Sequence, residues 1–205
     1  MNWYRVYLVT DRSLCLGRSL EDVVYAAVRG GAGAVQLREK HASSREFLEL
    51  ARALVRRIQP LGIPLIINDR ADIALASGAA GLHVGQSDLP PDDARCLMGP
   101  EAIVGLSVET FDQLKEAASF DIDYAGISPI FATPTKTDTH TPWGLDGLRK
   151  ARAMSPLRLV AIGGIHGSNA AEVVDAGADS LAVVSEICSA PYPQAATEHL
   201  LSVFA

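Results

Sequence analysis

Apolar and polar residues alternate along the chain in segments of two lengths. Short runs rich in Val, Ile, Leu and Ala are separated by longer stretches in which apolar residues recur every three or four positions. An uninterrupted apolar run is typical of a parallel strand covered on both faces, and the longer spacing is typical of an amphipathic helix. Eight strands are therefore predicted, at residues 4–10, 34–38, 64–68, 81–85, 103–107, 124–130, 159–164 and 181–185.

The segments between these runs carry helix start and stop signals. Ser19, Ser43 and Thr110 are each followed three residues later by a side chain that completes a capping box or a close variant of one. Three junctions resemble one another: "GAGAVQL" from residue 31, "GAAGLHV" from 78 and "GADSLAV" from 177. Each offers a glycine helix stop, a small linker and a strand. The chain thus repeats one strand–helix unit of roughly 25 residues.

Alternating strands and helices predict an α/β fold with a parallel sheet and right-handed crossovers. Eight such units close most naturally into a (β/α)8 TIM barrel. A chain of 205 residues suits one compact domain over residues 1–205, at the short end of the range for that barrel. An open doubly wound sheet is the alternative, but no G-x-G-x-x-G follows the first predicted strand.

Composition narrows the classes of partner. A formal net charge of -6 argues against nucleic acid or an anionic membrane as a general partner. No apolar run is long enough to span a membrane, and the N-terminal run is too short for a signal peptide. Cys15, Cys96 and Cys188 are widely spaced and form no CxxC pair, so a cytoplasmic protein without a zinc site or disulfide framework is expected. The oligomeric state stays open, a homo-oligomer included.

Polar side chains gather where the predicted strands end. Barrel enzymes build their sites at the C-terminal ends of the strands, so this placement tests the predicted fold. The opposite junctions, such as "SGAAG", are made mostly of small residues. The strand ends carry Thr10-Asp11, Gln36 to Lys40, Asn68-Asp69, Asp88, Ser107, Thr133 to Lys136, Gly163-Gly164 and Val184-Ser185-Glu186.

Two carboxylates and three cations in this set indicate a metal-assisted anion site. Asp69 and Asp88 follow neighbouring strands, and Mg²⁺ typically takes one or two protein carboxylates together with phosphate oxygens and water. Arg38, Lys40 and Lys136 would then face a polyanion such as a diphosphate. The alternatives stay open: Asp69 as a helix N-cap, Asp88 as a plain loop carboxylate, and the cations as surface charges.

A second anion site is indicated after strands seven and eight. Gly164 and Ser185 fall where many barrels bind phosphate through backbone N–H groups, although a tight turn explains the glycines equally well. His83, inside the fourth strand, is expected to be a core or lining residue. No Ser/His/Asp arrangement and no histidine metal cluster stands out, which argues against a protein nucleophile. These features favour an enzyme that joins two phosphorylated small molecules with loss of diphosphate.

Several motifs resemble those of the thiamine phosphate synthase family. They are "YLVTD", "VQLREK", "IINDR", "GLHVGQSDLP", "GLS", "PIFATPTK", "AIGGI" and "AVVS", in the order and spacing of that family from about residue 7 to 185. The resemblance implies a transferase of thiamine biosynthesis that uses Mg²⁺. Its substrates would be 4-amino-5-hydroxymethyl-2-methylpyrimidine diphosphate and a thiazole or carboxythiazole phosphate, giving thiamine phosphate, diphosphate and, from the carboxythiazole, CO₂. The implied mechanism is dissociative, through a pyrimidine carbocation.

The resemblance also implies roles for residues that match the motifs. Asp69 and Asp88 would bind Mg²⁺. Arg38, Lys40, Ser107 and Lys136 would stabilise charge as diphosphate departs. The pyrimidine diphosphate would be held by Gln36, Arg38, Glu39, Lys40, Asn68, Ser107 and Lys136, and the thiazole phosphate by Thr133, Pro134, Thr135, Gly164, Val184 and Ser185.

Two positions depart from the family pattern, and the second of them bears on an alternative function. Ser128 stands where glycine is common, and Glu109 stands where a histidine is frequent. A thiazole tautomerase of the same superfamily generally uses that histidine and lacks much of the diphosphate and metal set. A non-catalytic regulatory barrel would be free to lose Asp69, Asp88 or Lys136, and none is lost. A phosphosugar epimerase would be expected to carry acid–base carboxylates or metal-binding histidines at the strand ends.

Overall fold

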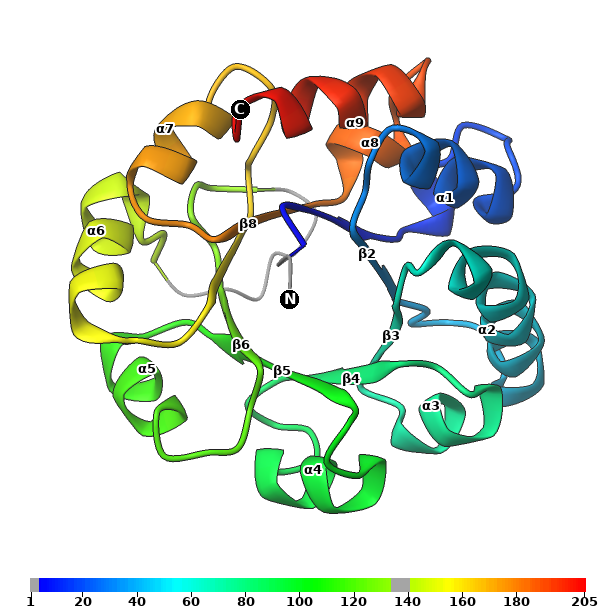
Figure 1. The fold of residues 1–205 in the computed structure, drawn as a ribbon, viewed down its shortest axis with the longest axis horizontal. Coiled ribbons are helices and arrows are strands. Elements are labelled where there is room, and N and C mark those ends of the chain that lie inside the picture. Colours follow the sequence, from blue (N-terminus) through cyan, green and yellow to red (C-terminus); the bar gives the residue numbers. More distant parts are fainter. Residues whose placement is uncertain (1–3, 134–140) are drawn as a thin grey trace.

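The computed structural model describes residues 4–133 and 141–205, which form a closed barrel of eight parallel strands (Figure 1). Neighbours along the chain are neighbours in the barrel, and β8 pairs with β1 to close it. The predicted α/β class and the (β/α)8 barrel are confirmed. The strands are β1 (Val6–Val9), β2 (Ala34–Leu37), β3 (Leu65–Asn68), β4 (Gly81–Val84), β5 (Ile103–Val108), β6 (Tyr124–Ile127), β7 (Leu159–Ile162) and β8 (Ser180–Val183).

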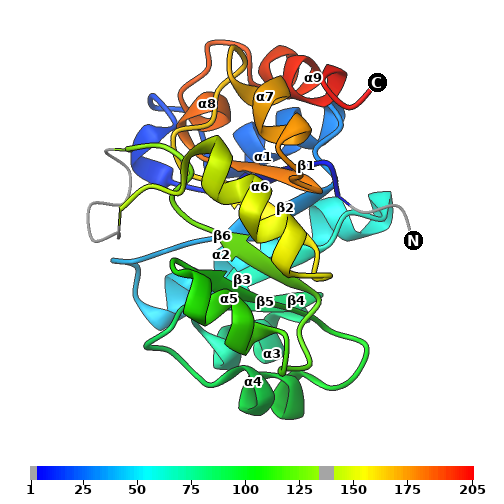
Figure 2. The ribbon, with the colours of Figure 1, turned by 90° about the vertical axis from the view of Figure 1, so that its left-hand side faces the viewer.

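Helices surround the barrel and cover the outer faces of its strands, as Figures 1 and 2 show. Two 3₁₀ turns, Arg12–Leu14 and Gln59–Leu61, lie in the connections. The α-helices within the described residues are α1 (Leu20–Arg29), α2 (Ser44–Ile58), α3 (Ala71–Ser77), α4 (Pro91–Met98), α5 (Phe111–Ala117), α6 (Gly144–Met154), α7 (Ala170–Asp175), α8 (Ser185–Cys188) and α9 (Pro193–Ser202).

Several predicted strands extend beyond the observed ones at their C-terminal ends, and local chemistry explains two of these differences. β6 stops at Ile127, although the apolar run continues to residue 130, because Pro129 has no N–H to donate to a ladder. β7 stops at Ile162 because Gly163 and Gly164 adopt positive φ values of 104° and 65°, which turn the backbone out of the sheet. All eight strands are nonetheless found at the predicted places.

The predicted helix caps are confirmed. Ser19 accepts a hydrogen bond from the backbone N–H of Asp22 at the start of α1. Ser43 and Thr110 form complete capping boxes at the starts of α2 and α5. The strand-to-helix turns that border the barrel mouth are therefore specified locally by short polar motifs.

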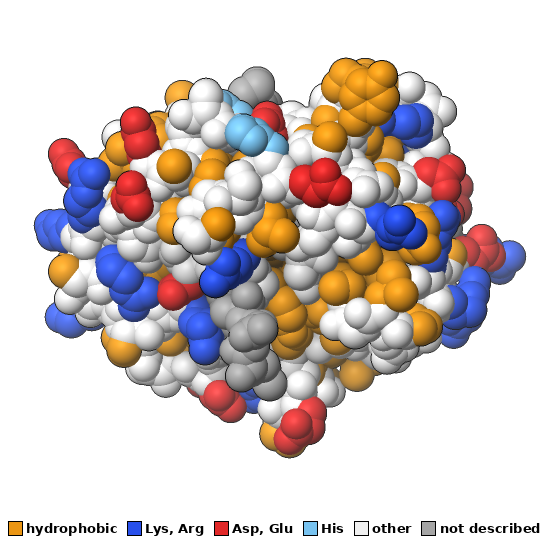
Figure 3. Space-filling model, turned by 45° about the horizontal axis from the view of Figure 1, so that its top comes forward, with side chains coloured by type: hydrophobic (Ala, Val, Ile, Leu, Met, Phe, Trp, Pro, Cys, Tyr) orange, Lys and Arg blue, Asp and Glu red, His pale blue; other side chains and the backbone are white. Residues whose placement is uncertain are grey.

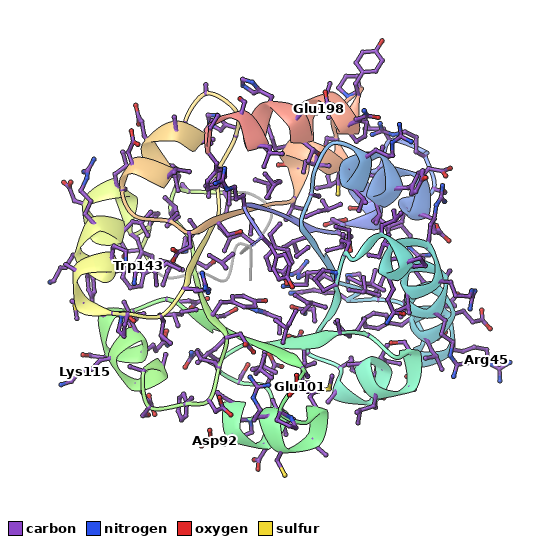
Figure 4. The ribbon with its side chains drawn as sticks, viewed as in Figure 1. Arg45, Asp92, Glu101, Lys115, Trp143 and Glu198 are labelled. Atoms are coloured by element: carbon purple, nitrogen blue, oxygen red, sulfur yellow. The ribbon has the colours of Figure 1, made fainter. Side chains whose placement is uncertain are left out.

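Two apolar layers hold the barrel together. The larger lies between strands and helices, where Phe47, Leu54 and Ile127 are fully or almost fully buried. The smaller fills the barrel interior and includes Tyr7 and Tyr124. Charged residues on the helices point away from both layers, as Arg45, Lys115 and Glu198 do in Figure 4.

On the face drawn in Figure 3, Lys and Arg side chains are interspersed with Asp and Glu. Hydrophobic side chains are scattered among them. In the part of the chain that the structure describes, no helix combines the length and the hydrophobicity that crossing a membrane requires.

Candidate active site

A cavity of about 960 Å³ opens at the C-terminal ends of the strands. Inward-facing residues of all eight strands reach it, and the βα loops form its rim. A polar mouth at this end of the barrel is what the sequence predicts. The described residues that were predicted for the site and line this cavity are Gln36, Arg38, Lys40, Asn68, Asp69, Asp88, Ser107, Thr133, Gly164, Val184 and Ser185.

Four predicted site residues do not join this set. Glu39 is not among the lining residues, and its Oε1 lies 3.2 Å from both Nε and Nη2 of Arg12. This ion pair ties the loop after β2 to the turn after β1. Pro134, Thr135 and Lys136 lie outside the described residues.

Asp69 and Asp88 lie close enough to interact directly, although they follow different strands. Asp69 has a left-handed backbone, with φ at 62°, and its N–H donates to the carbonyl of His83, 2.8 Å away. Asp88 folds back so that its Oδ2 accepts from the N–H of Gly85 at 2.8 Å. A Cβ on residue 85 would lie 2.8 Å from the same oxygen, so a larger residue there would force the Asp88 carboxylate to shift.

The alternative role of Asp69 as a helix N-cap is wrong. Helix α3 begins at Ala71 with Arg70 at its N-cap position. The guanidinium of Arg70 binds Asp72 and Ser44 on the outside of the barrel. Asp69 is therefore left to face the cavity with its strained backbone, a pattern that is common at functional sites.

The surroundings of Asp69 perturb its ionisation. The crowding of protein atoms around the mouth, together with the charge of Asp88 and a hydrogen bond to it, raises the pKa of Asp69 from 3.8 to about 6. The positive charges of Arg38 and Lys40 act in the opposite direction. Solvent still reaches Asp69, so water screens part of the repulsion.

This pair matches the ligand preference of Mg²⁺. Within residues 4–133 and 141–205, no cluster of three or more His, Cys, Asp or Glu side chains has metal-binding geometry. Two mutually repelling carboxylates are nevertheless the usual protein share of a Mg²⁺ site, because phosphate oxygens and water complete the octahedron. The donor set therefore suits a hard divalent cation that arrives with a phosphorylated ligand.

The opposite side of the mouth is built from the ends of β7 and β8. A Cβ on Gly164 would lie 2.8 Å from Cβ of Phe131 and 3.0 Å from the carbonyl oxygen of Ala132, so only glycine brings the backbone this close. The side chain of Asn169 donates to the carbonyl of Gly164 at 2.9 Å, and Glu186 Oε1 accepts from the N–H of Gly167 at 2.9 Å. These two contacts fix the loop, and neither Asn169 nor Gly167 was predicted from the sequence.

The cavity floor is the largest feature that the sequence did not reveal. His83 lines the cavity, as expected, but it also stacks on Tyr124, with ring centroids 5.5 Å apart and planes inclined by 20°. Tyr124 meets Tyr7 edge to face at 5.9 Å. Burial raises the pKa of both tyrosines, so both hydroxyls stay protonated.

The two departures from the family pattern both border the cavity. Ser128 is buried, and its carbonyl accepts from Nε1 of Trp143 at 3.3 Å. Glu109 lines the rim just after β5. Its backbone N–H donates to Oε1 of Gln113 at 2.7 Å, within the cap of α5.

The fold and the mouth define a class of protein: a (β/α)8 barrel with a polar cavity built from its βα loops. Residues 6–187 match the family described as thiamine monophosphate synthase. The chain is 58% identical over 189 residues to the thiamine-phosphate synthase of Albidiferax ferrireducens, covering 92% of the chain and 86% of the relative. It is 53% identical to that of Vibrio parahaemolyticus over 99% of both proteins. The chain therefore belongs to the thiamine monophosphate synthase family, and the resemblance seen in its motifs is confirmed.

Solved structures agree with this assignment. The thiamine phosphate pyrophosphorylase from Pyrococcus furiosus aligns with a TM-score of 0.89 at 35% identity, covering 98% of this chain and 96% of that one. A 3-hexulose-6-phosphate synthase aligns with a TM-score of 0.71 at 16% identity, which shows a shared fold alone.

Proposed function

We propose that the chain is a thiamine phosphate synthase. It condenses 4-amino-5-hydroxymethyl-2-methylpyrimidine diphosphate with thiazole phosphate or carboxythiazole phosphate, giving thiamine phosphate and diphosphate. The observation that carries this proposal is the 53% identity to a thiamine-phosphate synthase over 99% of both chains. A cytoplasmic location and small-molecule partners belong to the same proposal.

The diphosphate side of the mouth would be formed by the loops after β2 to β5. Arg38 and Lys40 border the cavity near Asp69, where they would neutralise a diphosphate. Gln36, Asn68 and the more distant Glu39 would help to hold the pyrimidine substrate, with Lys136 of the loop after β6. Ser107 reaches the cavity from β5 and would donate a hydrogen bond to the departing oxygen.

Asp69 and Asp88 would hold Mg²⁺ at this side. When bound, the ion supplies a Lewis acid for the diphosphate oxygens. Burial and the charge of Asp88 raise the pKa of Asp69, which supports the assignment, because a bound cation would offset the repulsion between the two carboxylates.

The thiazole phosphate would bind on the opposite side. Gly164, Val184 and Ser185 border the cavity after β7 and β8, where barrels commonly bind a phosphate through backbone N–H groups. Thr133 also lines the cavity, and Pro134 and Thr135 would complete the site.

The arrangement suits a reaction without a protein nucleophile. The bond between the pyrimidine methylene carbon and the diphosphate oxygen breaks, and its electron pair leaves with diphosphate. The ring nitrogen of the thiazole then donates its lone pair to the resulting carbocation. With the carboxythiazole, CO₂ is also lost. The residues around the cavity therefore act by positioning both substrates and stabilising charge on the leaving group.

The alternatives are a thiazole tautomerase and a non-catalytic regulatory barrel. The comparisons with curated synthases do not favour either of them. The cavity also has Glu109 at the rim position where the tautomerase histidine is expected, while Asp69 and Asp88 are both present.

A product assay separates these functions. Purified protein is incubated with pyrimidine diphosphate and each thiazole phosphate, and products are separated by chromatography. The proposal predicts thiamine phosphate only when both substrates are present. Rearrangement of the thiazole without condensation would identify a tautomerase, and binding without any product would identify a regulatory barrel.

A further inference from the structure

A continuous chain of hydrogen bonds crosses the cavity floor and joins five strands. Gln36 Nε2 on β2 donates to the hydroxyl of Tyr7 on β1 at 3.2 Å, and this hydroxyl lies 2.9 Å from that of Tyr124 on β6. The Tyr124 hydroxyl lies 2.9 Å from Nδ1 of His83 on β4. Nε2 of His83 lies 2.9 Å from Oγ of Ser107 on β5. We call this set the floor relay.

Strand register and two glycines fix the rings of the floor relay. His83 pairs with Gly105, and Gly105 pairs with Tyr124, so a residue without a side chain separates the two stacked rings. A Cβ on Gly105 would lie 2.1 Å from Cζ of Tyr124, and a Cβ on Gly126 would lie 3.3 Å from Cε1 of His83. The relay therefore has little freedom to move, which is the condition for preorganised hydrogen bonding.

The donors and acceptors of the relay define a direction. The amide of Gln36 donates to Tyr7, so the proton of Tyr7 has Tyr124 as its acceptor. Tyr124 then donates to Nδ1 of His83, which leaves the ring proton on Nε2 and makes Ser107 Oγ its acceptor. In the reverse direction, Tyr7 would accept from both partners, and its own buried proton would have neither as acceptor, a costly arrangement.

This direction decides what Ser107 offers to the cavity. When Nε2 of His83 donates to Oγ, the serine proton is free to point at a ligand. With the other imidazole tautomer, the hydroxyl of Ser107 would donate its hydrogen bond to Nε2 of His83. It would then present only oxygen lone pairs to the cavity, and these repel an anion. Ser107 lines the cavity, so the tautomer of a residue beneath it sets the polarity of this part of the wall.

We propose that His83 is a positioning residue that, through its Nε2–H tautomer fixed by Tyr124, holds the hydroxyl of Ser107 as a hydrogen-bond donor toward the leaving diphosphate. The role of Ser107 rests on the proposed synthase function. The tautomer itself rests only on the hydrogen bonds of the floor.

Imidazole ¹⁵N NMR tests the tautomer without substrates. Long-range ¹H–¹⁵N spectra of the ¹⁵N-labelled protein near neutral pH should show a single His83 tautomer that carries its proton on Nε2. The Tyr124→Phe variant keeps the ring but removes the donor to Nδ1, so it should lose this single tautomer. Tyr25→Phe is the matched control, because Tyr25 packs against Arg57 on the outer helices and should leave the His83 signals unchanged. An Nδ1-protonated His83 in the wild type would overturn the proposal.

Kinetics test whether His83 acts through Ser107. His83→Phe keeps a ring on Tyr124 but removes both nitrogens, and should lower kcat about tenfold or more, with a much smaller change in KM for the pyrimidine diphosphate. Added to Ser107→Ala, it should change kcat by less than about twofold, because the group through which it acts is already gone. Multiplicative losses in the double variant would contradict the proposal, as would an unchanged kcat in His83→Phe.

The two measurements distinguish the possible failures. Circular dichroism shows whether each variant is folded. If His83→Phe does not fold, Tyr124→Phe is used in its place to disrupt the floor relay. A wild-type protein that makes no thiamine phosphate but shows Nε2-protonated His83 would refute the proposed synthase function and support the proposed tautomer. An active wild type with Nδ1-protonated His83 would support the synthase function and refute the proposed tautomer.

Discussion

Asp69 and Asp88 are held close together by backbone geometry, before any ligand is considered. The left-handed backbone of Asp69 and the turn at Gly85 bring the carboxylates of two βα loops together at the mouth. Folding raises the pKa of Asp69 from 3.8 to about 6, so the folded chain binds this proton more tightly than the unfolded chain does. Stability therefore falls as pH rises from about 4 to above 6, where the carboxylate is charged in both states.

Asp69→Asn should stabilise the metal-free protein most at pH 8 and progressively less as the pH falls towards 4, where the carboxylate is protonated in the folded chain and increasingly protonated in the unfolded chain as well. Thermal unfolding in a chelator measures this. Mg²⁺ should raise the Tm of the wild type but not of the variant.

Asp92→Asn is the control, since Asp92 is exposed on α4 and points away from the barrel (Figure 4). It should bring no gain at pH 8. A wild type whose metal-free Tm does not fall between pH 5 and pH 8 relative to Asp69→Asn would refute the proposed repulsion.

Lys136 belongs to the loop after β6 and is one of the cations predicted for the site. It lies outside the described residues. Lys136→Ala should lower kcat by about tenfold or more with the fold intact, if the ammonium meets charge that develops on diphosphate. Steady-state kinetics measure this, with Lys115→Ala as the control, because Lys115 is exposed on α5 (Figure 4). An unchanged kcat would remove Lys136 from the mechanism.

Residues at strand ends were predictable because their position along the chain already places them at the mouth. Asp69, Asp88 and Ser107 follow directly from this rule. Tyr7 and Tyr124 were not found, because each lies near the start of an apolar run where an aromatic residue looks like ordinary core. Their hydroxyls meet only through the closure of the barrel.

Short capping motifs set the helices that border the site. Thr110 Oγ1 accepts from the N–H of Gln113 at 3.2 Å, and Oε1 of Gln113 accepts from the N–H of Thr110 at 3.2 Å. Thr110→Ala should lower the free energy of unfolding by about 1 kcal/mol, because it leaves the N–H of Gln113 without its acceptor. Denaturant unfolding measures this, and Thr110→Ser should retain most of the stability. Equal losses in both variants would mean that the hydroxyl is not the cause.

The contact between neighbouring strands β5 and β6 depends on Gly105. Gly105→Ala should lower the free energy of unfolding by about 1–3 kcal/mol. The new Cβ would overlap the fully buried ring of Tyr124, and the ring cannot move without disturbing His83. Gly126→Ala should cost less, since its Cβ would lie 3.3 Å from the nearest atom. Denaturant unfolding compares the two, and a Gly105→Ala protein as stable as the wild type would contradict this packing.

The existence and order of the elements were predictable from the sequence, whereas their register was not. Apolar runs and capping boxes are local signals, so all eight strands and the three tested caps were found. Pairing such as His83 with Gly105 and Gly105 with Tyr124 depends on how far each strand is shifted against the next. No local signal encodes that shift, so the floor relay had to come from the structure.

The barrel as a whole places two polar regions of the chain on one cavity. The loops after β2 to β5 supply its carboxylates and cations, and the ends of β7 and β8 supply its glycine-rich side. Closure through the β1–β8 pair joins the two regions. We propose that residues 1–205 fold as one domain for this reason, and that the two sides bind the two substrates of one reaction.

The most direct test of this account is the stoichiometry of turnover with and without metal. Thiamine phosphate and diphosphate are both quantified after mixing the purified protein with the two substrates in Mg²⁺, in a chelator, and after Mg²⁺ is restored. Equal amounts of both products are expected with Mg²⁺, no product in the chelator, and renewed turnover when Mg²⁺ is restored. Diphosphate release without thiamine phosphate, or full turnover in the chelator, would contradict it.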